Sequence, residues 1–362
     1  MNGIDRHRRY LVLSDGSTYP GYAFGSSSEA VGEVVFTTAN VGYPESLTDP
    51  SYRGQILAFT SPLIGNYGTS RDQWESDHIQ VSGVVIYDLT QPSHYKSEMS
   101  LDEWLKSEDV PGIFRVDTRA LVVKLREYGV MMGAIADTPQ DGFRLLEEAP
   151  RYDAIDYAKL VSPKEPIVYD GEDPCIGIID CGVKMGIVKS LLARGVRVVR
   201  YPCTMWRDAL NNCDGILFSN GPGNPNLLTY LVDAVEEVVR DRKPALGICL
   251  GHQVIALSMG ARIYKMKYGH RAINKPVLDL VRNKVYITTH NHGYAVDKDS
   301  LRDTGLRVWA IQPDDGTVEG LYHERLPILT TQFHPEARPG PLDTNWIFDK
   351  FISMIKGEGG WM

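Results

Sequence analysis

The chain has 362 residues, of which 43% are hydrophobic and 23% are charged, and its formal net charge is −8. This composition excludes a disordered chain, a collagen-like chain and a disulfide-stapled miniprotein, and the length predicts two or three domains. No run approaches the roughly 18 apolar residues that a spanning helix needs, so we expect no membrane association. The basic residues 6–9 precede only a short apolar run, 10–13, which is too short for a signal peptide and predicts a cytoplasmic protein.

All of the net negative charge lies in residues 1–163. Nucleic-acid binding needs a basic face, so we expect no nucleic-acid partner. The acidic excess is compatible with an ordinary solvated surface, which we favour, or with docking onto a basic partner protein.

The first part of the chain, residues 1–157, is rich in strand and turn signals and is predicted to be a mixed α+β domain. The periodicity of apolar residues predicts strands and two helices. The strands are 10–13, 32–38, 55–60 and 81–87, and the helices are 100–107 and 117–128. Asp117 or Thr118 would cap the second helix, and Gly129 would end it.

Residues 158–173 are polar and contain prolines, which predicts a linker. From residue 174 to 362 short apolar strands alternate with helices, which predicts an α/β domain whose parallel sheet is covered on both faces. The strands are 175–180, 196–199, 215–218 and 245–249, and the helices are 184–194, 227–241 and 252–259. Ligands on such sheets bind at the carboxyl ends of the strands.

The second domain contains all five cysteines, and no C-x-x-C pair occurs among them. Free thiols are therefore expected, and one of them stands in a distinctive place: Cys249, in Gly247-Ile248-Cys249-Leu250-Gly251, lies where a strand runs into a helix. This is the thiol counterpart of the G-x-S-x-G nucleophile turn, in which the following helix dipole favours the thiolate. A buried core cysteine is the alternative interpretation.

A nucleophilic cysteine needs a base, and the base needs a group that orients it. His334-Pro335-Glu336 follows a strand-like run, and residues i and i+2 project to the same side of an extended chain. Glu336 could therefore hold the His334 imidazole. Taken alone, the tripeptide is better explained as a surface His-Pro turn with a solvated glutamate.

Two further features are less specific. The loop 220–223 ends a strand of the same sheet, and its glycines would let backbone N–H groups approach a ligand and stabilise an oxyanion. In isolation, a plain proline–glycine turn is the better explanation of this loop. His290 and His292 alternate on a predicted strand as a metal pair would, but no third-ligand pattern accompanies them, so no metal is predicted.

Taken together, residues 247–253 and 332–336 resemble the class I, or triad, glutamine amidotransferases, and 220–223 and 291–293 fit the same pattern. Several segments elsewhere are similar to the small-subunit family of carbamoyl-phosphate synthetases, so the resemblance covers nearly the whole chain. These segments are 32–36, 47–52, 64–68, 116–119 and 265–270.

The resemblance implies a glutaminase subunit with Cys249, His334 and Glu336 as its catalytic triad. It implies that L-glutamine is bound by Ser51, Gly221, Gly223, Leu250, Gln253, Asn291, Gly293 and Tyr294. Ammonia would pass through a tunnel to a large subunit that binds ATP and magnesium, uses bicarbonate and makes carbamoyl phosphate for pyrimidine and arginine biosynthesis. No cofactor is expected on this chain, and the N-terminal domain is the expected docking surface for the partner.

The chain departs from the common family pattern at Phe333, at 272–275 and at His290, and we expect these departures to affect loop packing. Three alternatives remain open. The chain could serve another amidotransferase, it could be a non-catalytic regulatory subunit, or it could be a papain-like or DJ-1-like cysteine hydrolase. Other triad amidotransferases lack this N-terminal half. The intact triad disfavours a non-catalytic subunit, and a cysteine hydrolase would leave both His-Pro-Glu and the N-terminal half unexplained.

Overall fold

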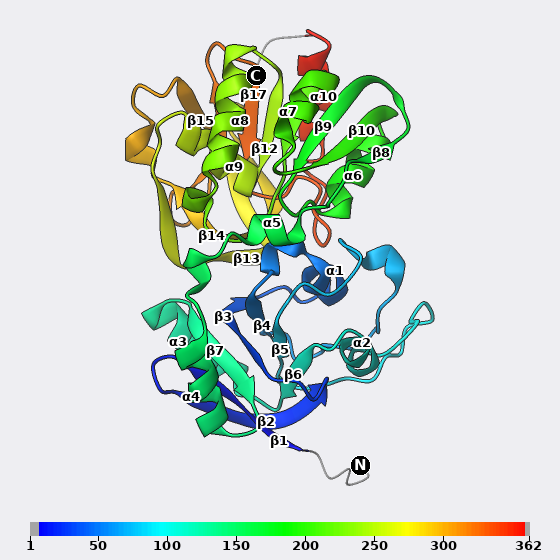
Figure 1. Cartoon of the computed structure of the whole chain (residues 1–362), viewed down its shortest axis with the longest axis vertical. Helices are drawn as coiled ribbons and strands as arrows, with labels where there is room; N and C mark the ends of the chain where they lie inside the picture. The colour runs from blue at the N-terminus through cyan, green and yellow to red at the C-terminus, as the bar shows by residue number, and fades with distance from the viewer. Residues whose placement is uncertain (1–6, 359–362) are drawn as a thin grey trace. The chain divides into compact units, whose positions relative to one another are not determined.

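The computed structural model describes residues 7–358, which form two compact units divided between Ile155 and Asp156 (Figure 1). The segment 158–173, predicted as a linker, belongs to the second unit and contains regular secondary structure. It includes most of helix α5 (Tyr157–Val161), strand β8 (Ile167–Tyr169) and the start of β9 (Glu172–Asp180). Strand β8 pairs antiparallel with Val198–Arg200, so its short apolar run forms a sheet edge despite the polar, proline-containing surroundings.

The first unit is built on a closed barrel with strand order β1-β2-β6-β5-β4-β3-β7. Its strands are β1 (Arg8–Leu13), β2 (Thr18–Gly25), β3 (Ala30–Thr37), β4 (Gln55–Phe59), β5 (Gly83–Val85), β6 (Pro111–Phe114) and β7 (Met131–Ala136). Strands β3 to β6 pair in parallel along the order β3-β4-β5-β6, and the other neighbours are antiparallel. The unit is therefore the predicted mixed α+β domain, but closure of the sheet was not predicted.

Helices α1 (Tyr43–Thr48), α2 (Leu101–Ser107), α3 (Thr118–Tyr128) and α4 (Pro139–Glu148) complete this unit. The Asp117 side chain accepts a hydrogen bond from the Ala120 N–H, and helix α3 ends at Gly129, so both predicted ends of this helix are confirmed. Such capping satisfies N–H groups that have no partner within a helix.

The second unit contains a ten-stranded sheet with strand order β14-β13-β15-β16-β17-β12-β11-β9-β10-β8. Its parallel part runs through β10 (Val196–Pro202), β9, β11 (Gly215–Phe218), β12 (Ala245–Ile248) and β17 (Ile328–Thr331). Every strand predicted in this half is present, and the predicted parallel sheet is confirmed.

Helices cover both faces of the parallel part (Figure 1). Apolar residues of α7 (Trp206–Asn212), α8 (Thr229–Arg240) and α9 (Leu250–Ser258) pack in one buried cluster, and those of α6 (Met185–Leu192) and α10 (Trp346–Ile355) pack in another. Strand residues alternate between the two: Ile179 belongs to the first cluster and Ile178 to the second.

The sheet continues into an antiparallel extension that was not predicted. It consists of β13 (Ile263–Asp279), β14 (Lys284–Val296), β15 (Leu306–Ile311) and β16 (Val318–His323). Strands β13 and β14 form a long hairpin with shifts in register after Lys265 and Ala272. Strand β16 pairs with β17 and so joins the extension to the parallel part.

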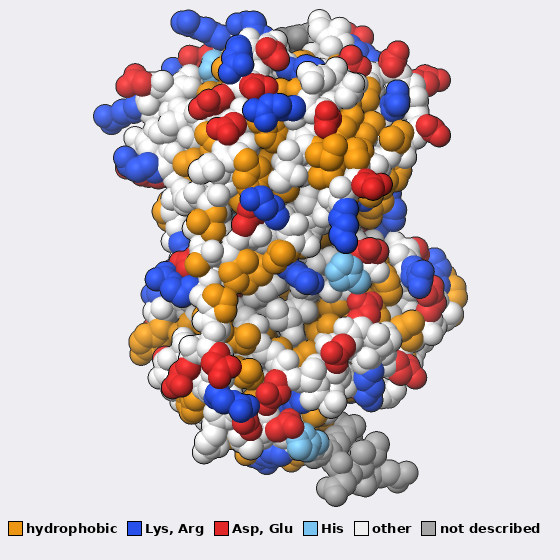
Figure 2. Space-filling view, viewed as in Figure 1, with side chains coloured by type: hydrophobic (Ala, Val, Ile, Leu, Met, Phe, Trp, Pro, Cys, Tyr) orange, Lys and Arg blue, Asp and Glu red, His pale blue; other side chains and the backbone are white. Residues whose placement is uncertain are grey.

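None of the helices within residues 7–358 has the length and apolar character needed to cross a membrane. On the face shown in Figure 2, acidic and basic side chains are interspersed over the N-terminal unit. A docking role for this unit stays a prediction.

Candidate active site

Cys249 occupies the turn between β12 and α9. It has φ 53° and ψ −100°, a conformation that a non-glycine residue rarely adopts, and its side chain is only 2% exposed. The Cys249 N–H donates to the Thr331 carbonyl at 2.8 Å, which fixes the turn to the end of β17. Such strain at a single polar residue is typical of a functional site.

The flanking glycines are required by close packing. A Cβ at Gly251 would lie 2.1 Å from the Phe218 carbonyl oxygen, and a Cβ at Gly247 would lie 2.7 Å from the Gly251 carbonyl oxygen. Helix α9 can therefore begin directly against β11 and β12 only if both positions lack side chains. The backbone strain of the turn falls on Cys249 itself.

His334 and Glu336 form a buried pair. The His334 Nδ1 and Glu336 Oε1 atoms are 2.7 Å apart, and both side chains are about 1% exposed or less. The predicted pairing is confirmed, but its local geometry differs from the prediction. Strand β17 ends at Thr331, and residues 334–337 form a turn closed by the Ala337 N–H and the His334 carbonyl at 3.1 Å.

Lys184 is a third member of this group that the sequence reasoning missed. Its Nζ lies 3.0 Å from Glu336 Oε1 and donates to the Ala337 carbonyl at 2.6 Å, with the lysine side chain 3% exposed. A buried carboxylate is stable only when it is paired and hydrogen-bonded. Lys184 and His334 together neutralise Glu336.

These charges shift the ionisation of both triad members. Burial opposes ionisation of Glu336, but Lys184 and His334 outweigh it and lower the pKa of Glu336 to about 2. Burial also opposes charge on His334, but the Glu336 carboxylate outweighs it and raises the pKa of His334 to about 10. The ring is thus held in its charged form, which can donate a proton.

Strand β14 connects the nucleophile to the base. The Asn291 carbonyl lies 3.5 Å from Cys249 Sγ, and the Thr289 carbonyl accepts a hydrogen bond from the His334 N–H at 2.9 Å. Among the described residues the His334 Nε2 atom has no hydrogen-bond partner of ordinary geometry, and the Cys249 side chain contributes to raising the pKa of His334. The Cys249 and His334 side chains are therefore close enough to interact, and His334 Nδ1 is already held by Glu336.

The loop 220–223 follows β11 at the carboxyl edge of the sheet. A Cβ at Gly221 would lie 2.3 Å from the Cys181 carbonyl oxygen and 2.8 Å from the Leu250 side chain, so only glycine fits. Gly223 has φ 93°, which also favours glycine. Both glycines are therefore required by the local structure, and the contact with Leu250 joins this loop to the start of α9.

The other residues predicted to bind glutamine fall into two groups. Leu250, Gln253, Asn291, Gly293 and Tyr294 lie on α9 and β14 of the second unit. The Gln253 Nε2 donates to the Tyr294 carbonyl at 2.8 Å and to Gln332 Oε1 at 3.0 Å, so this amide ties α9 to β14. Ser51 belongs to the first unit, where its N–H donates to Asp49 Oδ1 at 2.9 Å.

Both units of the chain match known protein families. Residues 11–135 match the CPSase domain of the carbamoyl-phosphate synthase small chain, and residues 177–354 match the class-I glutamine amidotransferase domain. A carbamoyl phosphate synthase small chain of Pyrobaculum aerophilum is 59% identical, over 96% of this chain and 100% of the relative. The chain belongs to the carbamoyl-phosphate synthase small chain family.

This chain also matches other members of the family over nearly their whole length. The small chain of Pyrococcus furiosus is 51% identical over 96% of this chain and 98% of the relative, and that of Staphylococcus epidermidis is 46% identical over 96% of each. Among solved structures, a putative GMP synthase protein from Thermoplasma acidophilum is 26% identical, with a TM-score of 0.45 over 52% of this chain and 96% of that one.

The departures from the family pattern lie close to one another in the small-chain fold. The Phe333 ring is fully buried and lies 6.4 Å from the His290 ring and 6.1 Å from Trp309. Ala272 pairs with His290 across the hairpin, and the register shifts between Ala272 and Lys275. These positions thus lie in or against β13 and β14, and none of them belongs to the triad.

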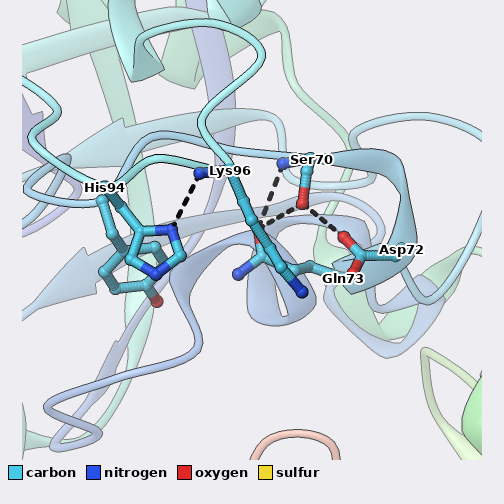
Figure 3. A pocket seen from close by; sticks show the side chains of 6 residues that line it. Ser70, Asp72, Gln73, His94 and Lys96 are labelled. Carbon is cyan, nitrogen blue, oxygen red and sulfur yellow. Dashed lines mark hydrogen bonds between the residues drawn. The ribbon is translucent and has the colours of Figure 1, made fainter.

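A pocket of about 230 Å³ in the N-terminal unit is lined by Tyr67, Ser70, Asp72, Gln73, His94 and Lys96 (Figure 3). Its hydrogen bonds are local. The Ser70 N–H donates to Gln73 Oε1 at 3.1 Å, and the Lys96 N–H donates to His94 Nδ1 at 3.2 Å. These bonds close the surface turns that form the pocket, and none of its lining residues was predicted to bind glutamine.

Proposed function

We propose that this chain hydrolyses L-glutamine at Cys249, as the glutaminase subunit of a carbamoyl-phosphate synthase. The observation that carries the proposal is a buried, strained cysteine whose side chain interacts with that of His334, while Glu336 holds His334 Nδ1 at 2.7 Å. A nucleophile, a base and an orienting carboxylate in this order are the three parts of a catalytic triad.

In the proposed reaction, Cys249 Sγ attacks the side-chain amide carbon of glutamine and forms a tetrahedral adduct. The His334 Nε2 proton passes to the departing nitrogen, the C–N bond breaks, and ammonia leaves a glutamyl thioester on the sulfur. The neutral His334 then takes a proton from water, the resulting hydroxide attacks the thioester, and glutamate is released with the thiolate restored. Glu336 keeps the imidazole in place during both steps.

Two backbone N–H groups are proposed to stabilise the oxyanion. Leu250 is the first residue of α9, so its N–H has no partner within the helix. Gly221 packs against the Leu250 side chain, which brings its loop to the same edge of the sheet. Donors fixed in place before the reaction are effective because they need no reorganisation when charge develops.

The remaining parts of the function concern the partner. We propose that a large subunit receives the ammonia, binds ATP and magnesium, and makes carbamoyl phosphate from bicarbonate for pyrimidine and arginine biosynthesis. The glutamine contacts of Ser51, Gly223, Gln253, Asn291, Gly293 and Tyr294 are also part of this proposal. Ammonia released into water would be protonated and lose its nucleophilicity, which is why it would be transferred without release.

The chain alone is expected to hydrolyse glutamine slowly and to turn over faster when its large subunit is added. Coupling of the two reactions requires that the partner change the glutaminase site, since otherwise glutamine would be consumed when no carbamoyl phosphate is made. Glutamate formation is measured with the purified chain, with the large subunit, and with an unrelated protein as control. Equal rates in all three samples would contradict the coupling.

A further inference from the structure

Three histidines and one glutamate form a buried cluster in the antiparallel extension of the second unit. His270 lies on β13, His290 and His292 lie on β14, and Glu319 lies on β16. All four residues are at most 5% exposed. One potential ligand atom from each side chain lies within 4.8 Å of the corresponding atoms of the other three.

The separations between these atoms are close to those around a small metal ion. His290 Nδ1 and His292 Nε2 are 3.4 Å apart. The Glu319 oxygens lie 3.7 Å from His270 Nδ1, 3.6 Å from His290 Nδ1 and 3.9 Å from His292 Nε2. A tetrahedral ion with bonds of about 2.0–2.1 Å places its ligand atoms about 3.4 Å apart. The four separations given above exceed this value by at most about 0.5 Å, and the cluster as a whole would contract around an ion.

The second nitrogen of each ring is already held from outside the cluster. His270 Nε2 lies 2.9 Å from Asp315 Oδ2, and His292 Nδ1 lies 2.9 Å from the Tyr294 carbonyl. His290 Nε2 lies 2.7 Å from Thr288 Oγ1. Metal-binding histidines are usually oriented in this way, by a carboxylate, a carbonyl or another polar group on the far nitrogen. These contacts direct the remaining nitrogens toward Glu319.

The centre of the cluster is not satisfied by hydrogen bonds. Within the described part of the chain, neither Glu319 carboxylate oxygen has a hydrogen-bond partner, and neither does His270 Nδ1. Leaving a buried charged group without partners costs several kcal/mol, and such groups in native proteins call for an explanation such as an ion. A cation bound among the four side chains would coordinate His270 Nδ1 and one Glu319 oxygen, and would neutralise the carboxylate.

We propose that His270, His290, His292 and Glu319 bind one Zn²⁺ ion. Imidazole nitrogens with one carboxylate oxygen suit zinc, and four protein ligands make a closed site of the structural kind. The sequence-based expectation of no metal rested on the lack of a third ligand near His290 and His292. The third and fourth ligands come from two other strands: His270 from β13, the hairpin partner of β14, and Glu319 from β16.

The position of the cluster indicates what the ion would do. His290 and His292 alternate along β14 with Thr289 and Asn291, and the carbonyls of these two neighbours contact the active site. The Glu319 carbonyl also accepts a hydrogen bond from the Gln332 N–H at 2.8 Å. Zinc would join β13, β14 and β16 directly behind the strand that contacts Cys249 and His334, and would thereby position that strand.

The test is the metal content of the full-length chain, purified without a polyhistidine tag and dialysed with Zn²⁺ and then without it. We expect about one zinc per chain by elemental mass spectrometry. Cobalt bound in place of zinc is expected to give the visible spectrum of a tetrahedral ion with nitrogen and oxygen ligands. A spectrum with thiolate charge-transfer bands would assign the metal to the cysteines and overturn the proposal, as would a wild-type chain that retains no zinc.

Variants locate the ion. Glu319→Gln and His290→Gln are expected to lose zinc, and Asp315→Asn is expected to bind it about 10–100-fold more weakly, since it removes only an orienting contact. The matched controls are Glu324→Gln and His78→Gln, which change exposed side chains outside the cluster. Zinc binding by the two cluster variants equal to that of the controls would overturn the proposal. If a cluster variant does not fold, the wild-type stoichiometry and cobalt spectrum decide.

Discussion

Replacing Cys249 with serine is expected to abolish glutamine-dependent synthesis of carbamoyl phosphate by the complex, while synthesis from added ammonia survives. Serine keeps the size of the side chain, but its hydroxyl is a far weaker nucleophile at neutral pH than a thiol beside a histidine. Loss of the nucleophile of a triad lowers kcat by about 10⁶-fold in the best-studied case. Both rates are measured on the same preparation, with ammonia in excess for the second.

Cys203→Ser is the matched control, because Cys203 is also buried but lies in the core beside Tyr230 and Ser162. It is expected to retain both activities. Loss of both activities in Cys249→Ser would show that the variant disturbs the complex rather than one step. Survival of the glutamine-dependent rate would exclude Cys249 as the nucleophile.

Replacing Lys184 with methionine is expected to destabilise the second unit by about 1–3 kcal/mol, since it removes one of the two charged partners of Glu336 and the donor to the Ala337 carbonyl. Lys184 Nζ is 3.0 Å from Glu336 Oε1, and its positive charge is among the causes that hold the pKa of Glu336 low. Methionine has a similar length and no charge. The free energy of unfolding of the second unit is measured by chemical denaturation.

Lys243→Met is the control that distinguishes the loss of an ion pair from the loss of hydrogen bonds to backbone carbonyls. Lys243 Nζ donates to two backbone carbonyls, of Leu210 and Cys213, and no carboxylate is part of that arrangement. The control is expected to lose less stability than Lys184→Met and to keep glutaminase activity. Equal losses in the two variants would mean that Lys184 acts only through the Ala337 carbonyl and not as the counterion of Glu336.

The sequence was sufficient for the parts of the site that are local. Cys249 was predicted from glycines two residues away on either side, and Glu336 from its spacing of two from His334. The pairing was correct although the segment is a turn and not a strand, because a spacing of two brings side chains together in either geometry. The alternating strands and helices after residue 174 were predicted for the same reason, since each is defined by its own apolar pattern.

What the sequence did not predict depends on contacts between distant residues. Lys184 lies just before α6, in the loop that follows β9, and its pairing with Glu336 arises only when the parallel sheet brings the ends of its strands to one edge. The same holds for His270 and Glu319, which lie on different strands from His290 and His292. Closure of the N-terminal barrel depends on β6, a strand of four residues that begins with Pro111 and Gly112 and carries little periodicity.

The most direct test of the catalytic role of Cys249 is to identify the sulfur that carries the glutamyl group. The chain is mixed with isotopically labelled glutamine, quenched in acid during turnover, digested and analysed by mass spectrometry. We predict a labelled glutamyl thioester on the peptide that contains Cys249, which disappears in Cys249→Ser. A labelled adduct on Cys175, Cys181, Cys203 or Cys213, or glutamate formation by Cys249→Ser at the wild-type rate, would contradict this role.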